Sequence, residues 1–168
     1  MYFSKFPLYE YDIQANQNRT LITDILRRVN LKANVRANTL VFDEYTVNDG
    51  ETPDIVATKY YDNPEFHWVI VTVNNITSIH DWPMDQVMLS NYVNDKYSNP
   101  DAVHHYELAQ TSGDTTILLT VASDTSGATQ VTNYEYEQTL NDKKRRIRLL
   151  DRGYVAQFKS EFEKLIQR

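Results

Sequence analysis

The sequence predicts an α+β protein in which a small strand–helix–helix module is embedded in a larger domain. That domain contains amphipathic helices and a small antiparallel β region. Capped prolines at Pro53 and Pro64 predict two short helices in tandem. Residues 106–136 contain stretches that alternate between apolar and polar side chains, as half-buried strands do. Residues 154–166 carry an apolar stripe at helical spacing, which predicts a final amphipathic helix.

The module begins with the β-prone run Tyr-Thr-Val at 45–47, which the turn-forming Asn-Asp-Gly at 48–50 should end. Thr52 offers a side-chain oxygen to cap a helix whose first residue is Pro53. Asn63, Pro64 and Glu65 repeat this arrangement and predict the start of a second helix.

Two local signals disagree over residues 68–73, Trp-Val-Ile-Val-Thr-Val. Their β-branched content favours a strand, whereas the capped proline upstream favours a helix. We give the cap precedence and predict that the second helix continues through this run.

The N-terminal residues 1–44 precede the module. Residues 1–18 are aromatic but aperiodic and predict an extended arm, which either packs on its own domain or becomes ordered on a partner. A short amphipathic helix is expected next, with Leu21, Ile22, Ile25, Leu26 and Val29 on one face. Strands at 31–35 and 39–47 are then predicted on either side of a turn at 36–38.

The predicted second part, 45–98, contains the module and a further helix from Val87 to about Lys96, which Asn99-Pro100 should end. The third part, 99–168, should be β-rich before its final helix. The expected strand positions are Tyr106 and Leu108, then Ile117, Leu119 and Val121, then Thr132, Tyr134 and Tyr136.

Composition excludes several classes of protein. The chain has 168 residues, a net charge of -6 and no cysteine, so disulfides and thiolate metal or redox sites are excluded, and a reducing cytoplasm suits it. The negative charge argues against nucleic-acid binding. The longest apolar run, 68–73, is too short to span a bilayer, and the start lacks the apolar core of a signal peptide. We therefore expect neither a nucleic-acid nor a membrane partner.

The sequence contains no recognisable catalytic set. Its four glycines cannot form a phosphate-binding loop or a dinucleotide fingerprint. Carboxylates around the module are interpreted as a solvated acidic face, with Asp54 and Glu65 at helix N-termini. We expect no enzyme activity, no cofactor and no metal site. His104 and His105 are adjacent, and on a regular strand they would point to opposite faces.

Aromatic and histidine side chains in the module have two interpretations. Trp68 and Trp82 are interpreted as packing residues, with stacking on sugar rings as the alternative. His67 is expected to lie beside Trp68 in the packing of the module.

Two features at the C-terminal end predict protein contacts. Six of the 17 positive residues cluster in a chain of net charge -6, which suggests a charge-complementary protein partner: Lys143, Lys144, Arg145, Arg146, Arg148 and Arg152. The stripe of the final helix must also be covered, by its own domain or by another subunit, and we expect Tyr154, Phe158, Phe162 and Ile166 to form that contact.

The module resembles LysM, a small βααβ fold usually associated with N-acetylglucosamine polymers. The resemblance lies in the strand at 45–47, the Asp-Gly-Glu-Thr at 49–52, the apolar Ile55 and Val56 with Lys59 and Tyr60, and Asn74. Pro53 stands where these modules usually carry an aliphatic residue. Phe-His-Trp at 66–68 is bulkier than usual, and no Gly-Gln-x-Leu-x-Ile-Pro ending follows.

Over residues 15–166 the chain resembles a particular LysM-like family, the gene-product-fifty-three baseplate wedge proteins of contractile-tailed bacteriophages. The most specific matching parts are Gly-Glu-Thr-Pro-Asp at 50–54, His67-Trp68 and Asp-Trp-Pro at 81–83. The resemblance implies a non-enzymatic structural subunit that binds other wedge proteins and helps join neighbouring wedges. Its expected location is the tail baseplate of the virion, after assembly in the host cytoplasm. The alternative is a LysM-type module that binds peptidoglycan or N-acetylglucosamine polymers, but the altered residues lead us to expect no glycan binding.

Overall fold

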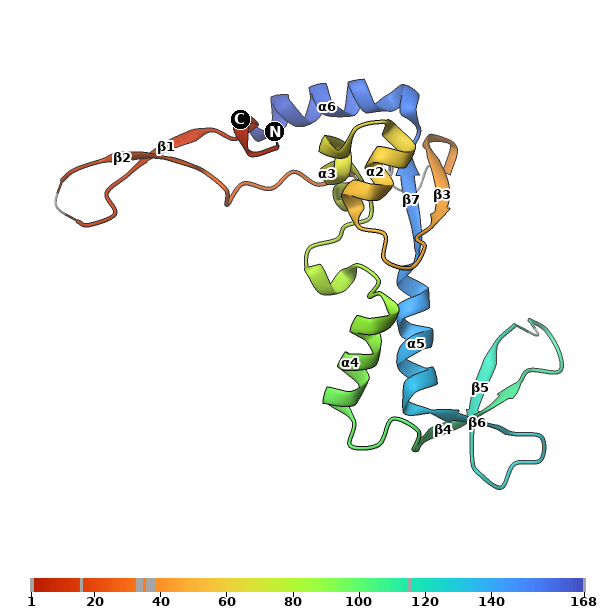
Figure 1. Cartoon of the computed structure of the whole chain (residues 1–168). Coiled ribbons are helices and arrows are strands. Elements are labelled where there is room, and N and C mark those ends of the chain that lie inside the picture. Colours follow the sequence, from red (N-terminus) through yellow and green to blue (C-terminus); the bar gives the residue numbers. More distant parts are fainter. Residues whose placement is uncertain (1, 16, 33–34, 36–38, 115, 168) are drawn as a thin grey trace. The chain divides into compact units, whose positions relative to one another are not determined.

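The computed structural model describes residues 2–15, 17–32, 35, 39–114 and 116–167, and the chain divides into two compact units (Figure 1). Unit 1 comprises Met1–Thr46, Glu51–Ile79 and Ile147–Arg168. Unit 2 comprises Val47–Gly50 and His80–Arg146. Helices and small antiparallel sheets occur together, so the predicted α+β class is confirmed. The units cross the boundaries predicted at 44 and 98, because most of unit 2 is inserted between two segments of unit 1.

Unit 1 is built on a strand pair formed by β3 (Phe42–Thr46) and β7 (Arg146–Leu150). The Asp151 N–H donates to the Val41 carbonyl at 3.0 Å, and the Val47 N–H donates to the Arg145 carbonyl at 2.9 Å. Residue numbers rise along one strand as they fall along the other, so the pair is antiparallel. Strand β7 is not predicted from the sequence, and its partner β3 lies about a hundred residues earlier in the chain.

Two helices follow β3, as the capped prolines predict. Helix α2 (Pro53–Tyr61) has Pro53 at its first position, although the Thr52 hydroxyl contacts Asp54 at 2.5 Å and does not cap the backbone. The Asn63 side chain accepts from the Glu65 N–H at 2.9 Å and begins the 3-10 turn η3 (Pro64–Phe66), which leads into α3 (His67–Val73). The expectation that capping would prevail over β propensity in this run is confirmed.

The core of unit 1 lies between these helices, β7 and the final helix α6 (Arg152–Ile166). The buried apolar side chains are Val56, Ala57, Tyr61, Val69, Ile70, Val73, Ile147, Leu149, Leu150, Val155, Phe162 and Ile166. Alternate residues of β7 are buried and exposed up to Leu149, as a strand with one covered face requires. Arg146 and Arg148 therefore lie on the exposed face of the strand.

The N-terminal segment divides into a packed part and an exposed part. The 3-10 turn η1 (Tyr2–Lys5) and the following Phe6 pack against Phe162 and Ile166, and Phe6 is only 7% exposed. Strands β1 (Leu8–Tyr11) and β2 (Thr20–Thr23) then form an antiparallel hairpin with Leu8 opposite Thr23. The predicted helix over residues 21–29 is wrong, because Thr20, Ile22 and Thr23 favour the extended hairpin. Leu26, expected on its apolar face, is 91% exposed.

Residues 31–47 only partly follow the predicted strand pair. Leu31 and Lys32 have no regular secondary structure, Thr39–Val41 is the 3-10 turn η2, and β3 begins at Phe42. The predicted turn at 36–38 lies outside the described residues.

Unit 2 contains α4 (Gln86–Lys96), α5 (Asn133–Lys144) and a three-stranded sheet in the order β5-β4-β6. The strands are β4 (Val103–Ala109), β5 (Leu118–Val121) and β6 (Thr129–Thr132), and η4 (Ile79–Asp81) lies at the start of the unit. The predicted α4 is confirmed, with Asp85 as its cap. The predicted strand through Tyr134 and Tyr136 is wrong, because Thr132 and Glu135 form a reciprocal capping box that begins α5.

Candidate functional site

The basic stretch does not form one described surface, because it crosses from unit 2 into unit 1 after Arg146. Lys143 and Lys144 lie in the last turn of α5, where cations suit the helix dipole. Lys144 donates to the His80 carbonyl at 2.8 Å. Arg152, in unit 1, pairs with Asp62 at 2.9 Å and lies over the Tyr60 ring. The six cations therefore have separate local environments.

Arg145 is a structural residue of unit 2. Its side chain is only 17% exposed and pairs with Asp49 and Asp142, each at 3.0 Å. It also donates to the carbonyls of Val47 at 3.3 Å and Met84 at 3.4 Å. One guanidinium thus connects the end of α5 to two other segments of its unit, which its planar set of five donors makes possible. A partner surface would have little access to Arg145.

The apolar stripe of α6 is divided between its own unit and the surface. Phe162 is 4% exposed, and its ring centroid lies 4.6 Å from that of Trp68. Phe158 stacks on Trp68 at 5.7 Å. Tyr154 and Leu165 remain 45% and 46% exposed. The helix therefore packs within unit 1 through Val155, Phe162 and Ile166 while leaving two large side chains accessible.

An open groove of about 570 Å³ runs along α6 in unit 1. Its apolar lining comes from α6, from the segment after β2 and from one end of the strand pair: Val29, Leu31, Val35, Val41, Leu150, Tyr154, Phe158, Phe162 and Leu165. The apolar stripe of α6 is evident in the sequence, whereas the part played by Val29, Leu31, Val35 and Val41 is not.

Trp68 belongs to the aromatic cluster of unit 1, as the packing interpretation predicts. Tyr2, Phe158 and Phe162 all lie within ring-contact distance of it. His67 differs from expectation, because it is exposed and its Nδ1–H donates to the Pro64 carbonyl at 2.9 Å. The prediction that His67 lies inside the packing of the module is therefore wrong.

Two buried carboxylates stand out among the acidic residues, and both are used in ion pairs. Glu51 in unit 1 is 7% exposed, accepts from the Tyr45 hydroxyl at 2.9 Å and pairs with Lys59. The Glu51 hydrogen bond is the main reason that the pKa of Lys59 is raised. The prediction that Glu51 belongs to a solvated acidic face is therefore wrong, because its side chain is buried.

Glu137 is the corresponding carboxylate of unit 2. It is 5% exposed and accepts from Lys96 at 2.7 Å and from the Tyr97 hydroxyl at 2.8 Å. Burial raises the pKa of Glu137, but the hydrogen bonds from Lys96 and Tyr97 outweigh it, so that the pKa is lowered overall. The charged carboxylate therefore connects α5 to the end of α4.

Two asparagine amides make paired contacts with backbone. Asn74 accepts from the Arg148 N–H and donates to the Arg148 carbonyl, both at 2.8 Å, which attaches the end of α3 to β7. Asn141, which is 2% exposed, makes the same pair of bonds to Met84 at 2.8 and 2.9 Å. Each side-chain amide thus forms the two hydrogen bonds that a peptide group of a neighbouring strand would form with that residue. The sequence alone does not identify Asn141 as buried, since α5 is not predicted there.

His104 and His105 lie together, contrary to the expectation that they point to opposite faces. Val103 pairs with Thr132 and His105 with Val131, so β4 advances two residues while β6 advances one. His104 is therefore the extra residue of a β-bulge, which interrupts the alternation of side chains. The two Nδ1 atoms lie 2.8 Å apart.

The described residues contain no arrangement in which three or more His, Cys, Asp or Glu side chains could hold a metal ion. Among the described helices, none is long and apolar enough to cross a membrane. Comparison of the chain with models of known protein families finds no match, and no curated protein matches it.

Proposed function

We propose that this chain is a non-enzymatic structural subunit of a bacteriophage baseplate wedge. In this role it binds other wedge proteins and helps join neighbouring wedges in the tail. It is incorporated into the virion after assembly in the host cytoplasm. The proposal draws on the sequence resemblance and on the arrangement of unit 1.

The observation that carries the proposal is the order of elements in unit 1. Strand β3 is followed by α2 and α3, and the strand that pairs with β3 is β7. This is the βααβ order expected of a LysM-like module, with residues 80–146 placed between the second helix and the closing strand. Such an insertion accounts for the missing LysM ending after Asn74. It also gives the protein a second unit that an isolated glycan-binding module does not need.

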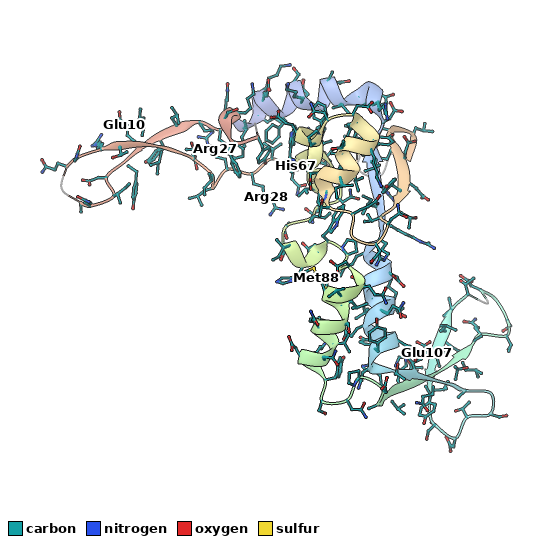
Figure 2. All side chains as sticks on the ribbon, in the orientation of Figure 1. Glu10, Arg27, Arg28, His67, Met88 and Glu107 are labelled. Atoms are coloured by element: carbon teal, nitrogen blue, oxygen red, sulfur yellow. The ribbon has the colours of Figure 1, made fainter. Side chains whose placement is uncertain are left out.

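Exposed apolar side chains on two small sheets support a role in protein contacts. On the β1–β2 hairpin, which also carries Glu10 (Figure 2), Leu8, Tyr9 and Leu21 are more than 60% exposed. In unit 2, Leu118 is 57% and Leu119 is 45% exposed. An isolated two-stranded hairpin is marginally stable in water, and exposed strand edges readily pair with other chains. Contacts with wedge proteins would cover these surfaces.

The buried ionisable groups support a structural role as well. A glycosidase needs a carboxylic acid with a raised pKa and a second carboxylate at a set distance in a cleft. Glu137 is instead held ionised by Lys96 and Tyr97, and its pKa is lowered. Glu51 is likewise engaged by Tyr45 and Lys59. These carboxylates are suited to holding helices together.

The test is the location of the protein in infected cells. Lysates carrying the chain should be fractionated into assembled tails, soluble protein and insoluble cell wall, and the chain detected by mass spectrometry. We expect it in assembled tails in a fixed ratio to other tail proteins. Recovery with insoluble cell wall, followed by release with soluble chitin oligomers, would instead support the glycan-binding alternative. Absence from purified tails would refute the baseplate role.

A further inference from the structure

The histidine pair on β4 has a geometry that ordinary packing does not require. Because His104 is the extra residue of the bulge, its ring meets that of His105 at an interplanar angle of 82° with 5.0 Å between ring centroids. The Nδ1 atoms of the two rings face each other at 2.8 Å. His104 is exposed and the His105 side chain is 17% exposed, so the pair is accessible from solvent.

Each ring is positioned by a different neighbour. Tyr136 of α5 stacks on His104 with a centroid distance of 3.9 Å and an interplanar angle of 10°. Glu107, two residues further along β4 (Figure 2), lies 2.8 Å from Nε2 of His105. A carboxylate on the far nitrogen of an imidazole is the arrangement that commonly orients metal-binding histidines. The pair is therefore held in place before any ligand arrives.

The Glu107 contact also determines the proton positions. An ionised carboxylate can only accept, so Nε2 of a neutral His105 carries the proton and Nδ1 has a free lone pair. His104 then either donates its own Nδ1–H to that lone pair or presents a second lone pair to a shared cation. These two states can be distinguished experimentally.

The separation of the two nitrogens is that of a hydrogen bond, and it also fits some metal coordination geometries better than others. With metal–nitrogen bonds of about 2.0–2.1 Å, two ligands at a right angle lie about 2.8–3.0 Å apart, whereas tetrahedral ligands lie about 3.3–3.4 Å apart. The observed 2.8 Å fits the right-angled case. Square-planar or tetragonal coordination by nitrogen is typical of copper(II) and nickel(II), and copper(II) binds more tightly in the usual order of divalent ions.

We propose that His104 and His105 form a copper(II)-binding site in which both Nδ1 atoms are ligands. Water fills the remaining positions, and the bound ion holds the bulge of β4 in its present form. The carboxylate of Glu107 behind His105 favours a cation at this place. The inference is independent of the proposed function.

The experiment uses the full chain without a polyhistidine purification tag, because such a tag would itself bind copper(II). Equilibrium dialysis against copper(II) chloride should give one tightly bound ion per chain, and electron paramagnetic resonance should report two equatorial nitrogen ligands. His104→Ala and His105→Ala should each lose this ion. His67→Ala, which changes an exposed histidine of unit 1, should bind as the parent does. Far-ultraviolet circular dichroism on every variant checks that the fold is retained.

Two further variants separate the proposed site from adventitious binding. Glu107→Gln should weaken copper binding about 10- to 100-fold without changing the stoichiometry, because it only alters the orientation of His105. Tyr136→Phe keeps the stacking ring and should bind normally. The site is refuted if parent and both histidine-pair variants bind copper equally, or if the spectrum shows fewer than two nitrogen ligands. A parent that binds no copper would leave the hydrogen-bonded pair as the correct description and would also refute the proposal.

Discussion

Unit 1 and the three-stranded sheet of unit 2 differ sharply in how they use apolar residues. Unit 1 buries such residues from β7, both helices of its module and α6 around a continuous core. In contrast, none of the described residues of β4, β5 and β6 is buried, and Leu118 and Leu119 on the edge strand are largely exposed. Buried apolar area is the main source of folding stability. Unit 1 therefore has the means to be stable by itself, while the sheet presents surface that a partner can cover.

The polar contacts of unit 2 offset part of this difference. Its buried apolar residues among those described are Val47, Pro83, Leu89 and Val93, and the side chains of Glu137 and Asn141 are buried in the same unit. Hydrogen bonds and ion pairs thus carry a larger share of the cohesion in unit 2 than in unit 1.

Phe162→Ala should lower the free energy of unfolding of unit 1 by about 3–5 kcal/mol, since it removes a buried ring and leaves a cavity beside Trp68. Leu165→Ala, on the exposed side of the same helix, is the matched control and should change stability far less. Urea unfolding followed by tryptophan fluorescence measures both. Equal effects of the two substitutions would show that α6 is not docked as described.

Arg145→Gln should lower the stability of unit 2 by about 1.5–3 kcal/mol, because it removes charged hydrogen bonds to Asp49 and Asp142. The exposed Lys143, next but one in the chain, is the control, and Lys143→Gln should have almost no effect. Hydrogen exchange resolved by residue would locate the loss in α4 and α5.

A charge reversal meant to test the basic stretch as a partner surface should therefore spare Arg145 and use Lys143 and Arg146. If the Arg145 variant is as stable as the parent, this arginine is not structural.

Glu137→Gln should lower the stability of unit 2 by about 1–2 kcal/mol at neutral pH, because Lys96 loses its charged acceptor. The pKa of Glu137 is lower in the folded chain than its ordinary value of 4.5, so the folded state favours the ionised group. Its contribution is complete above about pH 4.5 and disappears as the pH falls through the folded pKa. The stabilities of parent and variant should thus converge in acid. Thermal unfolding between pH 3 and 7 measures this, and a constant difference across that range would contradict it.

Leu118→Lys should change the stability of the isolated protein by no more than about 0.5 kcal/mol, because its side chain is already in water. It should nevertheless reduce incorporation into tails, since a charge on an edge strand opposes pairing with another chain. Thr129→Lys places the same charge on β6, the opposite edge of the sheet, and distinguishes an effect of β5 from one of added charge. Normal incorporation of the Leu118 variant would exclude β5 as a contact surface.

The local elements of the module follow from the sequence. Helix α2 begins at Pro53, and the turn η3 that leads into α3 begins at Pro64, because proline at the first helical position acts within a few residues. The α6 stripe and the end of α4 are likewise local patterns. The stripe residues Tyr154, Phe158 and Phe162 follow from the same kind of pattern, since all three lie on one helix. Phe162 is buried within unit 1, and a partner contact through the exposed Tyr154 remains a prediction.

Features that depend on pairing between distant segments are not evident in the sequence. The apolar spacing after residue 20 also fits a helix. Residues 20–23 nevertheless form a strand, because β1 supplies backbone hydrogen-bond partners. Strand β7 pairs with β3, and Arg145 forms an ion pair with Asp49, although about a hundred residues separate the partners in each case. The bulge that brings the rings of His104 and His105 together arises from a register shift against β6. The residue pattern of β4 alone does not predict this shift. Sequence periodicity reports which faces a segment can bury, whereas the identity of the covering segment depends on contacts between residues far apart in the chain.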